Sequence, residues 1–223
     1  MKRLICILFV FVSISAKAQN EKNLLIELGT EIPLNYSIGL VSNFSEHLQF
    51  SFRTGVLTKP YDLLILEIIE LTGTKESLVN TIRDAFTYGL TAKGGINYTF
   101  PEFYTGIYYS YGQIHATDVP VDILNNYFEF NLPPNFFDPI EYTLESTLHN
   151  IGIMIGKTFP LSENISLATE FSMIKAIKTK NSISCIYDDE MILASNIIHD
   201  KLDPLYKKFA YLPSINVFVR FNL

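Results

Sequence analysis

The residues best suited to carry chemistry are five charged side chains within stretches where apolar and polar residues alternate. All five occur on the polar side of that alternation. Acidic and basic groups that share an enclosed face must form ion pairs or be hydrated, because an unpaired buried charge is very costly. Such a set predicts either a network that stabilises the interior or a path or gate for ions. The five residues are Glu27, Arg53, Lys93, Glu170 and Arg220.

The histidines show none of the spacings of a metal site. They are His47, His115, His149 and His199. Neither His-Glu-x-x-His nor a Cys–His pattern occurs, so the sequence predicts no metal and no cofactor. Barrel-shaped enzymes that deacylate membrane lipid have a catalytic histidine and a serine two residues apart. Around His149, however, Thr147 and Ile151 occupy those positions. We therefore expect His149 to be a surface histidine and the protein not to be an enzyme.

The elements that position these residues begin after an N-terminal export signal. Lys2 and Arg3 precede an apolar stretch of eleven residues, and an Ala-x-Ala cleavage pattern ends at Ala18. We therefore divide the chain into a signal peptide, 1–18, and one domain, 19–223. Cleavage removes three basic residues and no acidic one, so the formal net charge changes from −6 to −9. This balance excludes nucleic acid as a partner, since binding to it requires clustered lysine and arginine.

Eight segments alternate apolar and polar residues with a period of two, which is typical of strands. Most are long enough to cross a bilayer as tilted strands, for which about 9–11 residues suffice. After the signal, no apolar run is long enough for a membrane-spanning helix. The segments are 24–31, 36–43, 47–58, 89–100, 103–113, 147–159, 164–176 and 208–223.

Tight and long connections follow one another along the chain. The stretches SNFSEH, FPEF and FPLSEN are rich in turn residues, and one further short loop lies near 32–35. Hairpins joined in this way have their tight turns at one end and their long loops at the other, as in outer-membrane barrels. The long loops are 59–88, 114–146 and 177–207.

Side-chain volume decides which face of such a barrel points inward. One parity carries large apolar residues such as Phe50, Ile107 and Ile153, and an eight-stranded barrel has too little interior space for them. The other parity is small and polar, and eight of the eleven glycines lie on it. We therefore predict that the apolar face meets lipid and that the five charged residues line the lumen. Aromatic residues at both ends of the segments are typical of the interface girdles of such barrels.

The long loops are not featureless. Leu78, Ile82 and Phe86 recur every four residues, so we expect two short helices between 61 and 86. The second loop is aromatic and rich in proline, and we expect these loops to pack on themselves over the barrel mouth rather than to form a partner site. The acidic run YDDEM, 187–191, offers oxygen ligands but lacks calcium-loop spacing, and we interpret it as solvated.

A signal ending in AKAQ, eight alternating segments and a closing VFVRFNL resemble a small outer-membrane β-barrel protein of the porin-like or OmpA-like superfamily, of the kind common in Bacteroidota. The resemblance covers nearly the whole mature chain. It implies the outer membrane of a Gram-negative bacterium as the location and insertion by the barrel-assembly machinery through the last strand. The terminal residue in that group is typically aromatic, whereas here it is Leu223, with Phe221 two residues earlier.

Together these observations predict an all-β fold: an eight-stranded antiparallel up-and-down transmembrane β-barrel with three long extracellular loops. Glu170 on the seventh strand should lie close to Arg220 on the eighth, and Arg220 should reach Glu27 across the closing seam. We favour a structural role for these charges, because eight strands leave little room for water.

The expected function is a non-enzymatic structural or surface-interaction role. The expected partner is outer-membrane lipid, and an extracellular ligand or protein at the long loops is the alternative to loops that pack on themselves. A narrow pore for small solutes, a lipid-modifying enzyme and an exported soluble barrel remain the alternatives.

Overall fold

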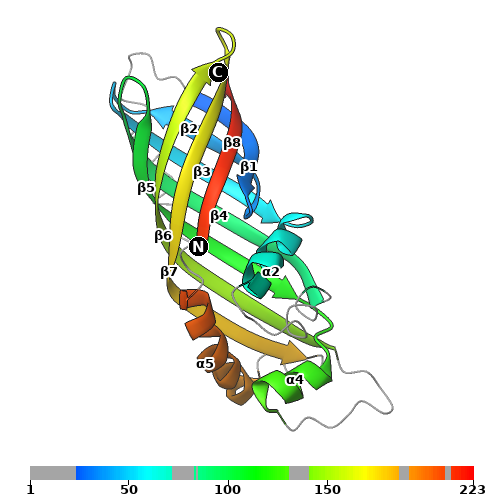
Figure 1. Ribbon diagram of the computed structural model, residues 1–223. Coiled ribbons are helices and arrows are strands. Elements are labelled where there is room, and N and C mark those ends of the chain that lie inside the picture. The colour runs from blue at the N-terminus through cyan, green and yellow to red at the C-terminus, as the bar shows by residue number, and fades with distance from the viewer. Residues whose placement is uncertain (1–23, 72–82, 84, 131–140, 186–190, 209–211) are drawn as a thin grey trace, which may run out of the picture.

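The chain forms a closed barrel of eight strands in the part that the structure describes, which is residues 24–71, 83, 85–130, 141–185, 191–208 and 212–223 of a computed structural model (Figure 1). Every strand pairs antiparallel with its neighbours in sequence, and β8 closes the ring on β1. The predicted eight-stranded up-and-down barrel is confirmed. The strands are β1 Leu24–Ile32, β2 Asn35–Asn43, β3 Leu48–Leu57, β4 Phe86–Thr99, β5 Tyr104–Ala116, β6 Tyr142–Pro160, β7 Ile165–Cys185 and β8 Leu212–Asn222.

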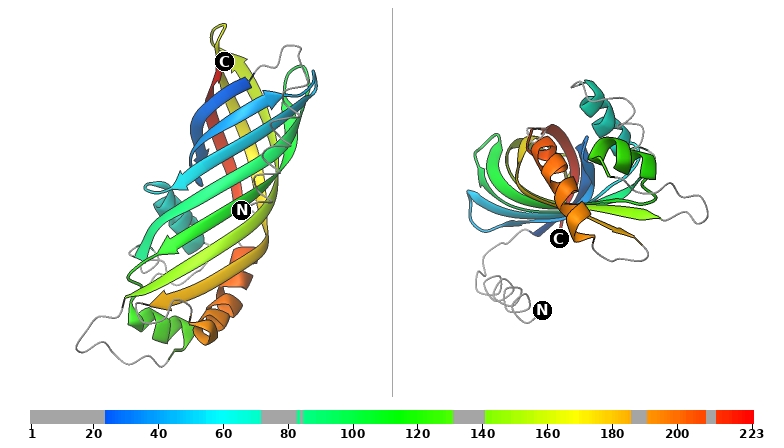
Figure 2. Two further views of the ribbon diagram at one scale, coloured as in Figure 1. Left: turned by 180° about the vertical axis from the view of Figure 1, so that it is seen from behind. Right: turned by 90° about the horizontal axis from the view of Figure 1, so that it is seen from below.

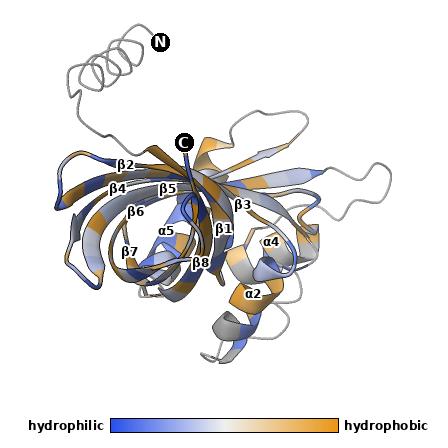
Figure 3. Cartoon of the chain, turned by 90° about the horizontal axis from the view of Figure 1, so that it is seen from above, coloured by the Kyte–Doolittle hydropathy of each residue, from blue (hydrophilic) through white to orange (hydrophobic). Residues whose placement is uncertain are grey.

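The two faces of the strands differ as the alternation predicts. In β3, exposed and buried residues follow one another along almost the whole strand, because successive side chains point to opposite faces. Large apolar residues form the outer face, where Ile107 and Ile153 are 66% and 60% exposed. Apolar residues recur around the whole ring (Figure 3). Among the described residues, no helix is both long and apolar enough to cross a membrane.

Strands β6 and β7 are longer than the alternation in the sequence predicts. They contain 19 and 21 residues, so 142–146 and 177–185, assigned above to loops, belong to the sheet. The register shifts between His149 and Asn150, where β7 has one extra residue. Such a bulge moves the side chains beyond it to the opposite parity. Beyond the bulge the outward positions are also polar, with Lys178 and Lys180 among them, so the apolar alternation that marks the other strands is absent.

Three described helices lie at the loop end of the barrel, opposite the tight turns (Figure 2). They are α2 Tyr61–Leu71, α4 Val121–Phe128 and α5 Ile192–Lys208. Helix α2 corresponds to the first of the two helices expected between 61 and 86, whereas most of the second falls on 72–82, outside the described residues. Helices α4 and α5 were not anticipated from the sequence.

Helix α5 lies along the inward face of the β7 extension. Every fourth residue of the helix contacts every second residue of the strand. Ser195, four residues before His199, bonds to the backbone of Ile183, while His199 contacts the side chain of Asn181. One helical turn further, Asp203 accepts a hydrogen bond from Thr179. Four helical residues rise about 6 Å and two strand residues about 6.6 Å, so the two repeats stay in register.

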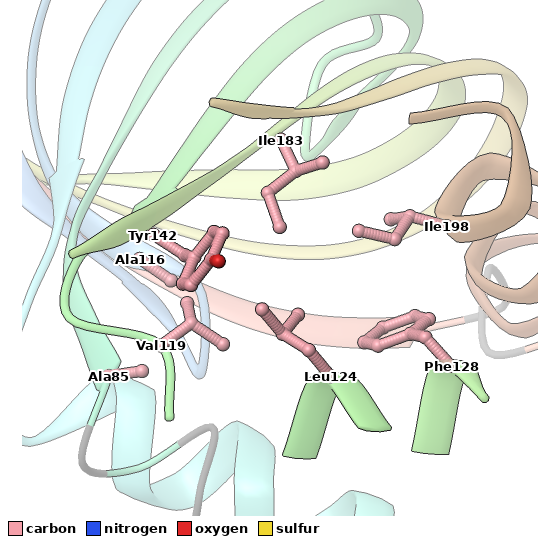
Figure 4. Packing of buried hydrophobic residues seen from close by; sticks show 8 residues of the cluster. All are labelled: Ala85, Ala116, Val119, Leu124, Phe128, Tyr142, Ile183 and Ile198. Atoms are coloured by element: carbon pink, nitrogen blue, oxygen red, sulfur yellow. The ribbon is translucent and has the colours of Figure 1, made fainter. Parts of the chain in front are cut away.

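The loop end therefore has an apolar core of its own. Leu124 and Phe128 of α4 face Ile198 of α5, and Tyr142 and Ile183 contribute from the extended strands (Figure 4). All five side chains are at most 5% exposed. The described parts of the second and third loops thus pack on the extended strands and on each other.

Glycines inside the barrel allow neighbouring strands and side chains to approach closely. A Cβ atom at Gly29 would lie 2.0 Å from the carbonyl oxygen of Val217 and 2.6 Å from the ring of Phe218. Gly94 lies on the outer face between Phe52 and Tyr109, and a Cβ atom there would meet no atom within 4 Å. The same substitution should therefore have opposite consequences on the two faces.

We predict that Gly29→Ala destabilises the barrel by about 1–3 kcal/mol, because β8 must move to admit the methyl group. Gly94→Ala is the matched control and should be neutral or slightly stabilising, since alanine loses less backbone freedom than glycine. The midpoint of unfolding in urea, measured in detergent micelles, compares the two. Equal midpoints would show that Gly29 does not face a filled lumen.

Candidate functional site: the lumenal charge ring

The structure places all five predicted charged residues inside the barrel. They come from five different strands, and each residue is at most 7% exposed. They are Glu27 on β1, Arg53 on β3, Lys93 on β4, Glu170 on β7 and Arg220 on β8.

Four of these residues form a closed cycle of alternating charge, which we call the charge ring. Arg53 makes two bonds to Glu170, Nη1 to Oε2 at 2.7 Å and Nη2 to Oε1 at 2.6 Å. Its Nε atom bonds Glu27. Arg220 reaches Glu27 through Nε at 3.1 Å and Glu170 through Nη2 at 3.4 Å. Each carboxylate is therefore shared between two guanidinium groups.

Barrel geometry explains why these residues meet. Glu27 and Arg220 are directly opposite each other where β1 pairs with β8. Arg53 and Glu170 are four strands apart in a ring of eight, so their bonds cross the lumen. Gly39 lies between Glu27 and Arg53 on β2, and a Cβ atom there would approach the side chains of both within 3 Å. The missing side chain of Gly39 lets this pair form.

Neutral side chains complete the hydrogen bonds of the ring. The Tyr104 hydroxyl donates to Glu170 at 2.7 Å and accepts from Arg220 at 3.1 Å. Asn216 donates to Glu170 at 3.2 Å, and Arg220 donates to Thr158 at 3.1 Å. Buried ions are tolerated when their remaining donors and acceptors are satisfied. This requirement accounts for the polar residues around the ring.

Two aromatic residues support the guanidinium groups from within the lumen. The guanidinium carbon of Arg53 lies 4.1 Å from the centre of the Phe218 ring, and that of Arg220 lies 5.1 Å from the centre of the Tyr104 ring. Rings placed this way attract a cation more strongly where water is excluded. The Tyr104 ring itself lies over Gly156, where a Cβ atom would be 2.6 Å from it.

The fifth predicted residue, Lys93, pairs with Glu31, which was not among the residues predicted from the sequence. Glu31 is 3% exposed, and the Lys93 ammonium also lies 4.2 Å from the centre of the Tyr108 ring. Glu31 stands four residues after Glu27 and therefore has the same parity, which is the signal that identifies it. With it, the described lumen holds three cations and three anions, so its formal charge is zero.

A small cavity with both polar and apolar lining lies beside this second pair. Its volume is about 100 Å³, and Glu31, Asn35, Arg53 and Lys93 are among the residues that line it. A water molecule occupies roughly 30 Å³ in the liquid, so the space suits a few waters. The charge ring, of which Arg53 borders this cavity, is otherwise tightly packed, because Glu27, Arg53, Glu170 and Arg220 are only 0–3% exposed.

The histidines lie outside this site. His149 is on the outer face, where its Nδ1 atom bonds the Tyr109 hydroxyl. His115 lies 3.2 Å from Glu145, and His199 contacts Asn181. His47 lies near the carbonyl oxygen of Thr99 at the turn end. Within the described ranges, no group of three His, Cys, Asp or Glu residues is placed to hold a metal ion.

Comparison with known proteins supports the architecture. No protein-family model matches the sequence, and no curated protein matches it. The fold is similar to that of a major outer membrane protein from Thermus thermophilus, with a TM-score of 0.52 and 9% identity over 92% of this chain and 100% of that one. Acinetobacter baumannii CarO2 aligns over the same shares with a TM-score of 0.40 and 13% identity. The first likeness, at 9% identity, shows the fold alone: a barrel of the architecture found in an outer-membrane protein.

We predict that Glu170→Gln lowers the free energy of unfolding by about 3–5 kcal/mol, because it leaves two guanidinium groups to share one carboxylate. Glu163→Gln, in the exposed turn between β6 and β7, is the matched control and should change stability by less than about 0.5 kcal/mol. Unfolding in urea, followed by circular dichroism in micelles, measures both.

A double-mutant cycle tests whether the ring acts as a unit. The double variant Arg53→Met/Glu170→Gln should be destabilised by much less than the sum of the two single variants. It keeps the Arg220–Glu27 pair and removes both partners of the Arg53–Glu170 pair, so neither is left as an unpaired ion. Additive effects would show that Arg53 and Glu170 do not stabilise each other in the folded protein.

Proposed function

We propose that this protein is an integral outer-membrane β-barrel that does not conduct, with a structural or surface-interaction role and no enzymatic activity. The observation that carries the proposal is the charge ring, which crosses the lumen and buries Glu27, Arg53, Glu170 and Arg220 almost completely. The outer face of the barrel, its filled lumen and the surroundings of His149 each add support.

The outer face supports a membrane location. Large apolar residues that are more than a third exposed recur on every strand, with Ile38, Phe52, Ile107, Ile153 and Ile215 more than half exposed. Monomeric soluble proteins rarely expose contiguous apolar patches beyond a few hundred Å². A barrel also satisfies all of its backbone hydrogen bonds within the ring, which a lipid environment requires. The structural likeness to an outer membrane protein from Thermus thermophilus agrees with this location.

The orientation and assembly follow from the same proposal. The tight turns would face the periplasm, and the helices α2, α4 and α5 would lie outside the cell, as in outer-membrane barrels generally. Residues 1–18 would direct export and be removed near Ala18, but they lie outside the described residues. The closing strand β8 would carry the signal for the barrel-assembly machinery of a Gram-negative envelope.

The lumen supports a closed barrel rather than a pore. Porins of 16–18 strands leave an aqueous channel, whereas the interior of an eight-stranded barrel is just wide enough for side chains or one small ligand. Arg53 spans the interior to Glu170, and Phe218 and Tyr104 fill the space beside the two arginines. A narrow channel remains the second candidate, because the small cavity at Lys93 and Glu31 could serve as its vestibule.

The surroundings of His149 support a non-enzymatic role. Its Nδ1 atom is hydrogen bonded to the Tyr109 hydroxyl, and the centres of the Tyr111 and His149 rings lie 5.5 Å apart in an edge-to-face arrangement. A hydrolytic site needs a nucleophile within hydrogen-bond reach of a base. The described hydrogen-bond partner of His149 is the hydroxyl of a tyrosine and not that of a serine or threonine, so we assign this histidine to the aromatic girdle.

Fractionation tests the location. The full chain, expressed in a Gram-negative host, should be recovered with the outer membrane, and its gel mobility should change on boiling, because a folded barrel resists detergent until it is heated. The boiled and unboiled forms are compared on one gel after extraction. A protein that stays soluble without detergent and shows no mobility change would contradict the proposal.

Conductance in planar bilayers tests whether the ring closes the lumen. The natural protein should give no steady channels. Arg53→Ser combined with Glu170→Ser removes one cation and one anion together, and it should raise the conductance because the cross-lumen bonds are lost. Glu102→Ser with Lys157→Ser removes an exposed pair at the turn end and serves as the control. Steady channels from the natural protein would favour the pore instead.

A further inference from the structure

The outward-facing basic residues of the barrel are unevenly distributed. Among the described strand residues, four lysines and no arginine are exposed on the outer face. Lys157 lies at the turn end, 4.0 Å from Glu102. The other three, Lys175, Lys178 and Lys180, follow one another on β7 toward the loop end. The whole chain is acidic, with a formal charge of −6, so composition does not explain this cluster.

Aromatic residues accompany these lysines on the neighbouring strands. Three rows run across the outer face at this end. Tyr109 and His149 are hydrogen bonded to each other, and the Tyr111 ring meets the His149 ring edge-on at 73°. Tyrosine and lysine together are typical of the level where a bilayer meets water. From β5 to β7, the rows are Tyr109–Ile151–Lys175, Tyr111–His149–Lys178 and Gln113–Thr147–Lys180.

An apolar groove begins where the lysines end. It crosses the outer face of the barrel with a volume of about 960 Å³, and Ile107, Ile153 and Met173 line it in the row just below Lys175. Lys175 is the one charged residue among those that line it. Gly94 contributes an open position on the groove floor, since no atom lies within 4 Å of where its Cβ would be. The groove is therefore apolar along its length and cationic at its loop-end rim.

We propose that this surface binds one class of ligand, a membrane lipid whose headgroup carries phosphate, with its acyl chains in the groove and its phosphates at Lys175, Lys178 and Lys180. We call it the lysine site. The inference rests on the proposed function, because it requires the apolar belt to lie within a bilayer. The combination of an apolar groove with cations at one end only is complementary to a lipid and not to a free anion.

The spacing of the lysines specifies the headgroup further. Lys175 and Lys180 are five residues apart on one strand, which corresponds to roughly 16 Å along it. A headgroup with two separated phosphates matches three lysines distributed over that length of strand better than a single phosphate does, so the site suits a headgroup with more than one phosphate. Each lysine near a membrane surface strengthens the binding of anionic lipid by about fivefold.

Native mass spectrometry of the folded full chain in neutral detergent tests the lysine site. Lipid A with two phosphates, lipid A with one phosphate and phosphatidylcholine are added in separate titrations. The natural protein should bind the two-phosphate lipid at least about tenfold more tightly than phosphatidylcholine, with the one-phosphate lipid between them. The variant K175Q/K178Q/K180Q should lose that preference, and K59Q/K157Q/K207Q, with the same change in net charge, should keep it.

The groove is tested separately from the charges. Gly94→Phe fills the groove and leaves every lysine in place, so it should weaken binding of the two-phosphate lipid several-fold. In the natural protein, a large excess of inorganic phosphate should fail to displace the bound two-phosphate lipid. Three results would overturn the proposal: no lipid preference in the natural protein, equal loss in the control triple variant, or complete displacement by inorganic phosphate.

Gel mobility of the same samples separates the test of the lysine site from the test of the outer-membrane barrel. A heat-modifiable barrel without lipid preference overturns the lysine site alone. A sample that shows no change in mobility on boiling contradicts the outer-membrane barrel as well.

Discussion

Neutralisation of charge inside a narrow barrel is the constraint on which the rest of this structure depends. Two arginines and two glutamates are enclosed where almost no water reaches them, and removal of any one leaves an ion without its counter-charge. The cycle Arg53–Glu170–Arg220–Glu27 resolves this by sharing every carboxylate between two guanidinium groups. Because Arg53 and Glu170 lie four strands apart, the cycle also joins opposite walls of the barrel.

Small residues around the ring follow from the same constraint. Gly39 leaves space for the pair between Glu27 and Arg53, and Gly156 leaves space for the Tyr104 ring that bonds Glu170. Apart from a few side chains such as Phe218, which packs on Arg53 in the lumen, the large apolar residues of the strands occupy the outer face, where Ile107 and Ile153 are largely exposed. The barrel thus has the polarity of a soluble protein reversed, with charge inside and hydrocarbon outside. This reversal connects the electrostatics of the lumen to the proposed membrane location.

The loop end adds a second layer to the barrel. Helix α5 and the β7 extension share a repeat of about 6 Å, which holds Ser195, His199 and Asp203 against the strand. The inward face of that extension is thereby covered, while its outward face presents Lys178 and Lys180. One strand therefore serves an apolar core on one side and the proposed lipid contact on the other. The bulge beside Asn150 sets which side chains go to which side.

The period-two pattern is a local property of the chain, which is why the sequence alone indicated the barrel, its polar lumen and the five charged residues on that parity. Glu31 shared the parity but stood at the end of its segment, where alternation no longer distinguishes strand from turn. The extensions of β6 and β7 escaped notice for a related reason: their outward positions are polar, and a bulge changes the parity of β7.

The partners of Arg53 and Lys93 were decided only by the tertiary structure. The approach of Arg220 to Glu27 and Glu170 was predicted from strand order, because β8 lies between β7 and β1 in the closed ring. The bond from Arg53 to Glu170, and that from Lys93 to Glu31, depend on the tilt of the strands and the width of the lumen. Those quantities arise from the register of all eight strands together, and no single stretch of sequence contains them. The sequence by itself determined which residues face inward; the closed ring determined their partners.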